Sequence, residues 1–239
     1  MERIIRYETL RQFAYSNDKL CKGKIKGIVL DFFGLGGTIM HNEDPERGVF
    51  FAEKDIVHVV PYYNPWCWMN PQTVAYVDEI IDVLIDHCQL PEDIPIVSSG
   101  LSMGGLCALV YTAKAKRTPA ACVANCPVCD LPYHFTERPD LPRTLYSAFY
   151  HEEGTVEEVL QRFSPLHLAE SMPDVPYYIF HCDMDKAVNK ELHSDRLIEK
   201  LKKNHTVMYH VVPGRGHCDL TDEMKELYLR YIADSILND

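Results

Sequence analysis

The stretch that decides the fold runs from Ile94 to Lys116 and reads IPIVSSGLSMGGLCALVYTAKAK. Its beginning, Ile94–Ser98, is short, apolar and rich in β-branched residues, which is typical of a buried strand. Its end, Leu106–Lys116, has the spacing and the alanine content of a helix. Between them lie the glycines of Gly100–Gly105. The stretch therefore predicts a strand, a sharp turn and a helix in direct succession.

The turn carries a serine between two glycines, in the order Gly100-Leu101-Ser102-Met103-Gly104. A residue on so tight a turn has a strained backbone, and side chains two positions away on either side would collide with neighbouring elements. The turn lifts the Ser102 hydroxyl above the sheet edge. It also directs the Met103 N–H to the same place, beside a helix N-terminus that favours an anion. This context predicts that Ser102 is a nucleophile and not an incidental serine of a glycine-rich turn.

A serine hydroxyl is a weak nucleophile at neutral pH and needs an adjacent base. The chain has eleven histidines. We predict that His217 is the base, because it lies in the glycine-rich loop Pro213–His217, straight after a strand. His181, at the end of another strand, is the chief alternative.

The base must be held in the correct tautomer by a third group, usually a carboxylate. We predict that Asp185 has this role, because it follows a buried strand and completes the chain order Ser, Asp, His. Asp183 lies two residues earlier and competes for the role. Asp130, in the loop after the preceding strand, is a third candidate.

A tetrahedral intermediate carries a negative oxygen that needs two hydrogen-bond donors. The Met103 N–H is expected to supply one. The other is expected from the glycine-rich loop Phe33–Gly37, with Leu35 as the first choice and Gly36 as the second. The alternative is that this loop only lets the chain pass close to the sheet edge.

The rest of the chain alternates strand-length apolar runs with helical patterns, which favours βαβ units. We predict an α/β fold with a mostly parallel central sheet flanked by helices, in a single domain over 1–239. Arg3–Glu8 and Arg11–Ser16 are expected to form an antiparallel entry pair. Further strands are expected at Ile25–Phe33, Asp55–Pro61, Ala120–Asn125, Tyr177–Phe180 and Val207–Val212, and helices at Pro71–Cys88, Lys190–Lys203 and Asp222–Leu237.

The segment 127–173 breaks this alternation, since it is rich in prolines and aromatic residues, with a helix expected around Thr155–Phe163. An insertion of this length between core elements is usually functional. We interpret it as a lid or cap.

Three C-terminal motifs add to this pattern. Ser164-Pro165-Leu166-His167 precedes a strand, His181-Cys182-Asp183-Met184-Asp185-Lys186-Ala187-Val188 follows it, and Gly214-Arg215-Gly216-His217 comes later. With the serine turn, they resemble the α/β-hydrolase superfamily over nearly the whole chain. The C-terminal part is most similar to the catalytic domain of the prolyl oligopeptidase family and to carboxylesterases. In that family the corresponding runs read S-P-L-H, H-G-x-x-D-x-x-V and G-x-G-H.

The sequence departs from the family pattern at two places. Phe33 stands where the family has a histidine before the oxyanion loop, and Cys182 stands where it has a glycine. The chain is also too short to include a β-propeller, which moves the expected substrate from peptides toward esters.

The resemblance implies a serine hydrolase that forms an acyl-enzyme on a small-molecule ester. Aromatic side chains near the expected oxyanion loop are predicted to line the substrate pocket, namely Tyr62, Tyr63, Trp66 and Trp68, and would suit an aromatic or medium-chain acyl group. An aminopeptidase acting on amides would use the same residues. A non-catalytic binding protein would normally have lost one of them.

Composition and charge disfavour several classes of binding partner and bear on localisation. The 35 acidic residues exceed the 24 basic ones, for a formal net charge of −11, which disfavours nucleic acid and anionic membranes. Scattered charges near the N-terminus argue against a signal peptide, and no apolar run is long enough to span a bilayer, so we expect a cytoplasmic protein. The oligomeric state is left open, a homo-oligomer included.

No cofactor and no metal are expected. The nine cysteines are predicted to be reduced thiols, since nothing in the sequence indicates export. The densest group, Cys122, Cys126 and Cys129, lacks the second paired half of a zinc motif. We interpret these residues as small buried hydrophobes.

Overall fold

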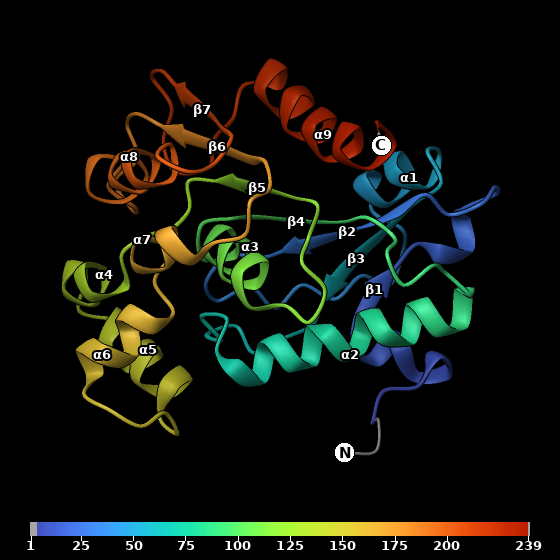
Figure 1. Cartoon of the computed structure of the whole chain (residues 1–239), viewed down its shortest axis with the longest axis horizontal. Helices are drawn as coiled ribbons and strands as arrows, with labels where there is room; N and C mark the ends of the chain where they lie inside the picture. Colours follow the sequence, from blue (N-terminus) through green and yellow to red (C-terminus); the bar gives the residue numbers. More distant parts are fainter. Residues whose placement is uncertain (1–3, 239) are drawn as a thin grey trace.

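Seven strands form one sheet in the computed structural model, which describes residues 4–238 (Figure 1). Their order across the sheet is β1-β3-β2-β4-β5-β6-β7. All neighbours from β3 to β7 pair in parallel, and β1 pairs with β3 in the antiparallel sense. The strands are β1 Ala14–Ser16, β2 Gly27–Phe32, β3 Ile56–Pro61, β4 Ile96–Leu101, β5 Ala121–Asn125, β6 Tyr177–Cys182 and β7 Val207–Val212.

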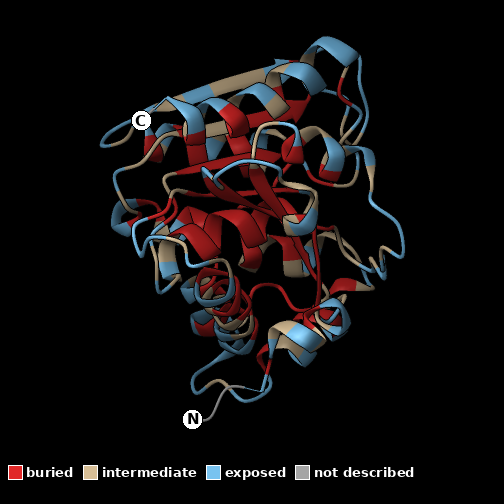
Figure 2. Ribbon diagram, turned by 90° about the vertical axis from the view of Figure 1, so that its right-hand side faces the viewer, coloured by how far each residue is buried: buried red, intermediate tan, exposed pale blue. Residues whose placement is uncertain are grey.

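Helices cover both faces of this sheet, as expected for parallel strands that are buried on both sides. The larger apolar core lies on the face covered by α2 (Pro71–Cys88), α3 (Met103–Lys114) and α8 (Arg196–Leu201). A second core lies on the opposite face, under α1 (Glu46–Ala52) and α9 (Asp222–Leu237). Figure 2 shows the buried strands between these two layers.

The predicted α/β fold is therefore confirmed. The bounds of α2, β7 and α9 coincide with the predicted ones, and α3 begins earlier than predicted, directly after Ser102. The predicted helix Lys190–Lys203 starts as a π-helical turn, Glu191–Asp195, and continues as α8.

The predicted N-terminal strand pair is wrong. Tyr7–Gln12 forms a 3₁₀ helix whose Leu10 is buried in the larger core. β1 is not paired with a preceding strand but with β3, with Tyr15 opposite Val60. A short apolar run can pair with a neighbouring strand in a hairpin or add to the edge of an existing sheet, and its own sequence does not distinguish the two. Arg3 lies outside the described residues.

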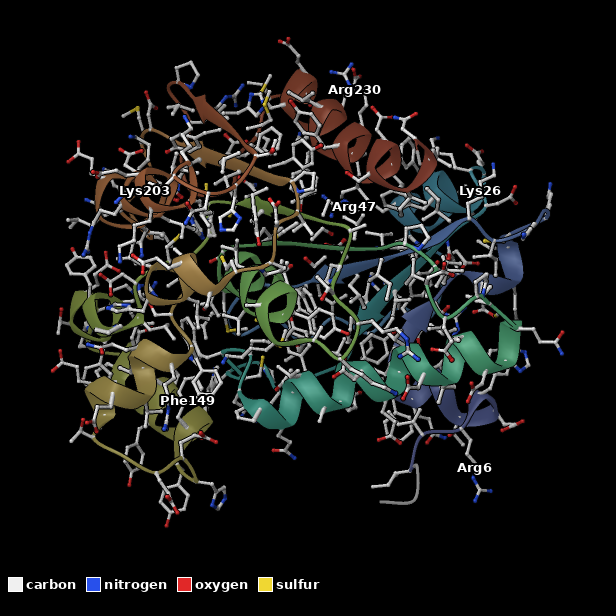
Figure 3. All side chains as sticks on the ribbon, in the orientation of Figure 1. Arg6, Lys26, Arg47, Phe149, Lys203 and Arg230 are labelled. Carbon is white, nitrogen blue, oxygen red and sulfur yellow. The ribbon has the colours of Figure 1, made fainter. Side chains whose placement is uncertain are left out.

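The segment 127–173 folds into short helices that are grouped on the left and lower left of Figure 1, beyond α3. They are α4 Leu131–Glu137, α5 Leu141–Phe149, α6 Val156–Arg162, α7 Pro165–Leu168 and the 3₁₀ turn Ala169–Ser171. The predicted helix Thr155–Phe163 is confirmed as α6. Phe149, labelled in Figure 3, stacks on Phe163 at a ring-centroid distance of 4.8 Å. The apolar residues of these helices are continuous with the larger core.

Within residues 4–238, no helix combines the length and the apolar character that crossing a bilayer requires.

Candidate active site

Ser102 lies on the sharp turn between β4 and α3, with φ 59° and ψ −125°. Non-glycine residues seldom adopt a positive φ, and such strain is concentrated at functional sites. The neighbouring glycines are required sterically. A Cβ atom on Gly104 would lie 2.0 Å from the carbonyl oxygen of Phe32, and one on Gly100 would lie 2.2 Å from the carbonyl oxygen of Gly104. The G-x-S-x-G spacing thus has the steric cause that the sequence suggested.

A tyrosine from the C-terminal helix supports this turn from below. The Gly100 N–H donates to the Tyr228 hydroxyl at 3.0 Å, and that hydroxyl lies 3.1 Å from the Val123 carbonyl oxygen, which can accept from it. Tyr228 belongs to α9 and is buried. Arg47 lies between α9 and the sheet, 5.6 Å from the Tyr228 ring (Figure 3). The position of α9 therefore bears directly on the start of the serine turn.

The structure brings Ser102, His217 and Asp185 into one chain of hydrogen bonds. Ser102 Oγ lies 2.8 Å from His217 Nε2, and His217 Nδ1 lies 2.6 Å from Asp185 Oδ2. The other carboxylate oxygen, Asp185 Oδ1, accepts from the N–H groups of Ala187 and Val188 at 2.8 and 3.0 Å. These contacts fix the buried carboxylate, so it can orient the imidazole.

The alternatives from the sequence have other partners. His181 is fully buried, with Nδ1 2.6 Å from Ser194 Oγ and Nε2 3.1 Å from the Val188 carbonyl oxygen; Nε2 also lies 3.4 Å from Asp185 Oδ2, so His181 supports the acid. Asp183 accepts from the Gly214 N–H at 2.7 Å. Asp130 forms an ion pair with Arg196 at 2.6 Å.

Electrostatics strengthens the pairing of Asp185 with His217. Burial acts to raise the pKa of Asp185, but hydrogen bonds from His181, His217 and the Val188 N–H outweigh it and hold that pKa well below its usual range. Burial likewise acts to lower the pKa of His217, and the hydrogen bond to Asp185, with Cys126 nearby, outweighs it and raises the pKa to about 9. The site therefore stabilises an imidazolium paired with a carboxylate.

Leu35 and Gly36, the two candidates for the second oxyanion donor, lie on a tight turn. Gly37 N–H donates to the Gly34 carbonyl at 3.1 Å and Gly36 has φ 76°, the features of a type II turn over Gly34–Gly37. The choice of Gly36 as second candidate is corrected, because its N–H donates to the Pro65 carbonyl at 3.0 Å. Leu35 and Met103 both line the cavity that holds Ser102. Met103 is the first residue of α3, where a helix N–H has no acceptor within the helix.

The cavity beside Ser102 has a volume of about 310 Å³. Apolar residues from several segments line it, among them Leu35, Trp68, Val128 and Val188. His134 and Arg138 add polar groups. Sequence reasoning missed these two residues, which come from the segment 127–173 and had no motif to mark them.

The expected aromatic wall is corrected in part. Trp68 lines the Ser102 cavity, fully buried, and its Nε1–H donates to Thr144 Oγ1 at 3.1 Å. Tyr62, Tyr63 and Trp66 line a second cavity of about 440 Å³ instead. Tyr63 donates its hydroxyl to the Phe33 carbonyl at 2.9 Å, and so braces the oxyanion loop from behind.

His134, which lines the Ser102 cavity, forms a cluster with Glu137 and His193 that does not suit a metal. His193 Nδ1 accepts from the N–H groups of Cys129 and Asp130 at 3.1 and 3.2 Å. A neutral ring then carries its proton on Nε2, which donates to Glu137 Oε2 at 3.0 Å. No lone pair of His193 is left for an ion, so we interpret the cluster as a hydrogen-bond network.

The comparisons with known proteins agree with this fold. The chain resembles a puromycin-hydrolysing peptidase of Mycobacterium tuberculosis (TM-score 0.67, 16% identity), with 90% of this chain and 35% of that one covered. It also resembles esterase B from Lactobacillus rhamnosis (TM-score 0.68, 12% identity, 91% and 78% covered). A third such structure is an S-formylglutathione hydrolase from Agrobacterium tumefaciens (TM-score 0.68, 17% identity, 89% and 85% covered). At these identities the likeness shows the fold alone.

Sequence comparison is more specific. A search of curated proteins gave no significant match. The model of the prolyl oligopeptidase family matches residues 79–234, a range that contains Ser102, Asp185 and His217. The chain spans about a third of the length of the puromycin-hydrolysing peptidase. Since the family model covers well over half of the 239 residues, the chain belongs to the prolyl oligopeptidase family of α/β hydrolases.

Proposed function

We propose that this serine hydrolase cleaves carboxylic esters through an acyl-enzyme, with Ser102 as nucleophile, His217 as base and Asp185 as the orienting carboxylate. One observation carries the proposal: Ser102 Oγ, on a strained turn, lies 2.8 Å from His217 Nε2, and His217 Nδ1 lies 2.6 Å from Asp185 Oδ2. This is the geometry by which such residues are recognised, whatever their sequence positions.

The reaction follows from these contacts. His217 Nε2 takes the hydroxyl proton as Ser102 Oγ attacks the carbonyl carbon, and Asp185 stabilises the resulting imidazolium. The imidazolium then protonates the leaving alcohol, and the acyl group remains on Ser102. In the second half, His217 takes a proton from water, which attacks the acyl-enzyme and releases the acid.

The negative oxygen formed in each half needs two donors, and we assign them to the N–H groups of Met103 and Leu35. Both residues line the Ser102 cavity. In this proposal the segment 127–173 acts as a cap, because three of its residues, Val128, His134 and Arg138, line the same cavity.

The Leu35 donor can be removed without disturbing the turn. Leu35 is the second residue of a type II turn, where proline is favoured, and Gly34 before it tolerates a following proline. Leu35→Pro is therefore expected to lower kcat by about 10²- to 10³-fold with little change in KM. Leu35→Ala, which keeps the N–H, is the matched control and should lose far less. Equal losses in the two variants, measured by steady-state kinetics, would show that the side chain matters and the N–H does not.

The preference for esters rests on shape. The Ser102 cavity of about 310 Å³ is small and has an apolar wall, which suits a compact acyl group. Esterase B and the S-formylglutathione hydrolase are among the proteins with this fold. An amide hydrolase is the second candidate, because the puromycin-hydrolysing peptidase and acylaminoacyl peptidases have the same fold.

A matched substrate pair tests this choice. We expect p-nitrophenyl esters to be hydrolysed with a kcat/KM at least 100-fold above that of p-nitroanilides with the same acyl group, after correction for their spontaneous rates. A higher value for aminoacyl anilides would favour the amide hydrolase. A fluorophosphonate probe, followed by mass mapping, should label Ser102; failure to label it would favour a non-catalytic binding protein.

A further inference from the structure

Two cysteines lie beside the base. The sulfur atoms of Cys126 and Cys218 and a ring nitrogen of His217 all lie within 4.8 Å of one another. Cys126 directly follows β5, whereas Cys218 follows His217. The fold therefore creates a cluster that no spacing in the sequence indicates.

The cluster has the dimensions of a zinc site. Cys218 Sγ lies 3.6 Å from His217 Nε2. In a tetrahedral site with Zn–S about 2.3 Å and Zn–N about 2.0–2.1 Å, a sulfur and a nitrogen ligand are about 3.5 Å apart. The spacing of this pair thus already suits one shared ion, which would displace the Ser102 hydroxyl from Nε2, and side-chain adjustments would bring in the Cys126 sulfur.

The surroundings of the three ligands also suit a metal. His217 donates its Nδ1–H to Asp185 at 2.6 Å, the arrangement that orients most metal-binding imidazoles. Cys126 Sγ accepts from the N–H groups of Cys182 and Cys218, both at 3.4 Å. These two N–H groups fix the position of the Cys126 sulfur beside the His217 ring.

The backbone holds both cysteines in an unfavourable conformation. Cys126 has φ 45° and Cys218 has φ 59°. A non-glycine residue persists there only where the surrounding structure imposes it, and such positions cluster at functional sites. Cys126 is buried and Cys218 is partly exposed, so an ion can reach the cluster from the Cys218 side.

We propose that Cys126, Cys218 and His217 form a reversible inhibitory site for a thiophilic divalent cation, Zn²⁺ above all. Zn²⁺ replaces the two thiol protons and, where the ring is an imidazolium, the proton on Nε2; these protons pass to solvent, and the ion accepts electron pairs from both sulfurs and from Nε2. No atom changes oxidation state. Because Nε2 is then occupied, His217 cannot take the proton of Ser102, and hydrolysis stops.

This inference departs from the expectation of a chain without a metal site. That expectation considered Cys122, Cys126 and Cys129, which are neighbours in sequence. The inhibitory consequence rests on the proposed function, whereas the binding of the ion does not. The experiment therefore measures the two separately.

Binding is measured first, on the full chain treated with a chelator, desalted and kept reduced with a phosphine. Titration with Cd²⁺, which forms an ultraviolet thiolate-to-metal band, should reach its end point at one ion per chain. Cys218→Ser and Cys126→Ala should each lose most of this band. Cys88→Ser, at the C-terminal end of α2, is the matched control and should keep it. An unchanged band in both Cys218→Ser and Cys126→Ala would overturn the site, whether or not the chain hydrolyses esters.

Inhibition is measured second, with each variant compared with its own metal-free rate. Zn²⁺ should inhibit the unmodified chain and Cys88→Ser at micromolar concentration, with full recovery on adding chelator, and Mg²⁺ should not inhibit. Half-inhibition of Cys218→Ser should need at least about 100-fold more Zn²⁺, since loss of an outer partner alone costs 10–100-fold. Equal inhibition of Cys218→Ser and the unmodified chain would overturn the proposal, as would full activity with one ion bound.

Discussion

Ser102→Ala is expected to lower kcat/KM for a p-nitrophenyl ester by about 10⁴- to 10⁶-fold, because the acyl-enzyme cannot form without the hydroxyl. The residual rate would come from the oxyanion donors and from binding alone. Alanine adds no bulk at this turn, and His217, whose Nε2 loses its partner, is partly exposed to solvent. The fold should therefore persist, with an unchanged circular dichroism spectrum and a Tm within a few degrees.

The control for this prediction is a serine elsewhere on the chain. Ser171 lies in the exposed 3₁₀ turn after α7, where its hydroxyl donates to the Leu168 carbonyl. Ser171→Ala should retain ester hydrolysis and fluorophosphonate labelling, both of which Ser102→Ala should lose. Near-normal hydrolysis by Ser102→Ala would mean that another group is the nucleophile.

Asp185→Asn is expected to lower kcat by about 10³- to 10⁴-fold with a small change in KM, because the amide favours the wrong imidazole tautomer. Asp185 Oδ2 accepts the Nδ1–H of His217, whereas an amide NH₂ at that place would require an acceptor nitrogen. Nε2 would then carry a proton and could not take another from Ser102. Steady-state kinetics on the best ester substrate measures the effect.

Asp183→Asn is the matched control, since Asp183 lies two residues away and accepts from the Gly214 N–H instead. Its loss of kcat should stay below about tenfold, because an amide oxygen can still accept that bond. A larger loss for Asp183→Asn than for Asp185→Asn would reverse the assignment of the carboxylate.

Much of the fold could be predicted because its central strands and main helices carry strong local patterns. β2, β3 and β5 are mostly apolar, as parallel strands buried on both faces tend to be. α2 shows apolar residues at helical spacing and has Asn70 as its N-cap. Sequence reasoning missed α1, which is short and contains Gly48, and misread the 3₁₀ helix Tyr7–Gln12. Tertiary contacts decide such short elements.

The residues of the candidate site were also predictable only in part. Ser102, Asp185 and His217 each lie in a motif whose spacing has a local steric or chemical cause, so the sequence could indicate all three. The use of the Gly36 N–H by Pro65 could not be predicted, because the two residues meet only when separate loops pack together. The same is true of Cys126 and Cys218, which are 92 positions apart.

The hydrogen bonds of Tyr228 determine how small a working version of this enzyme can be. A chain shortened to remove α9 would still encode the nucleophile, the base and the acid. It would leave the Gly100 N–H without its acceptor and uncover the apolar residues on the α9 face of the sheet. A helix that supplies no reacting group is thus part of the minimal catalytic unit, and protein engineers who trim or permute this chain should keep it attached.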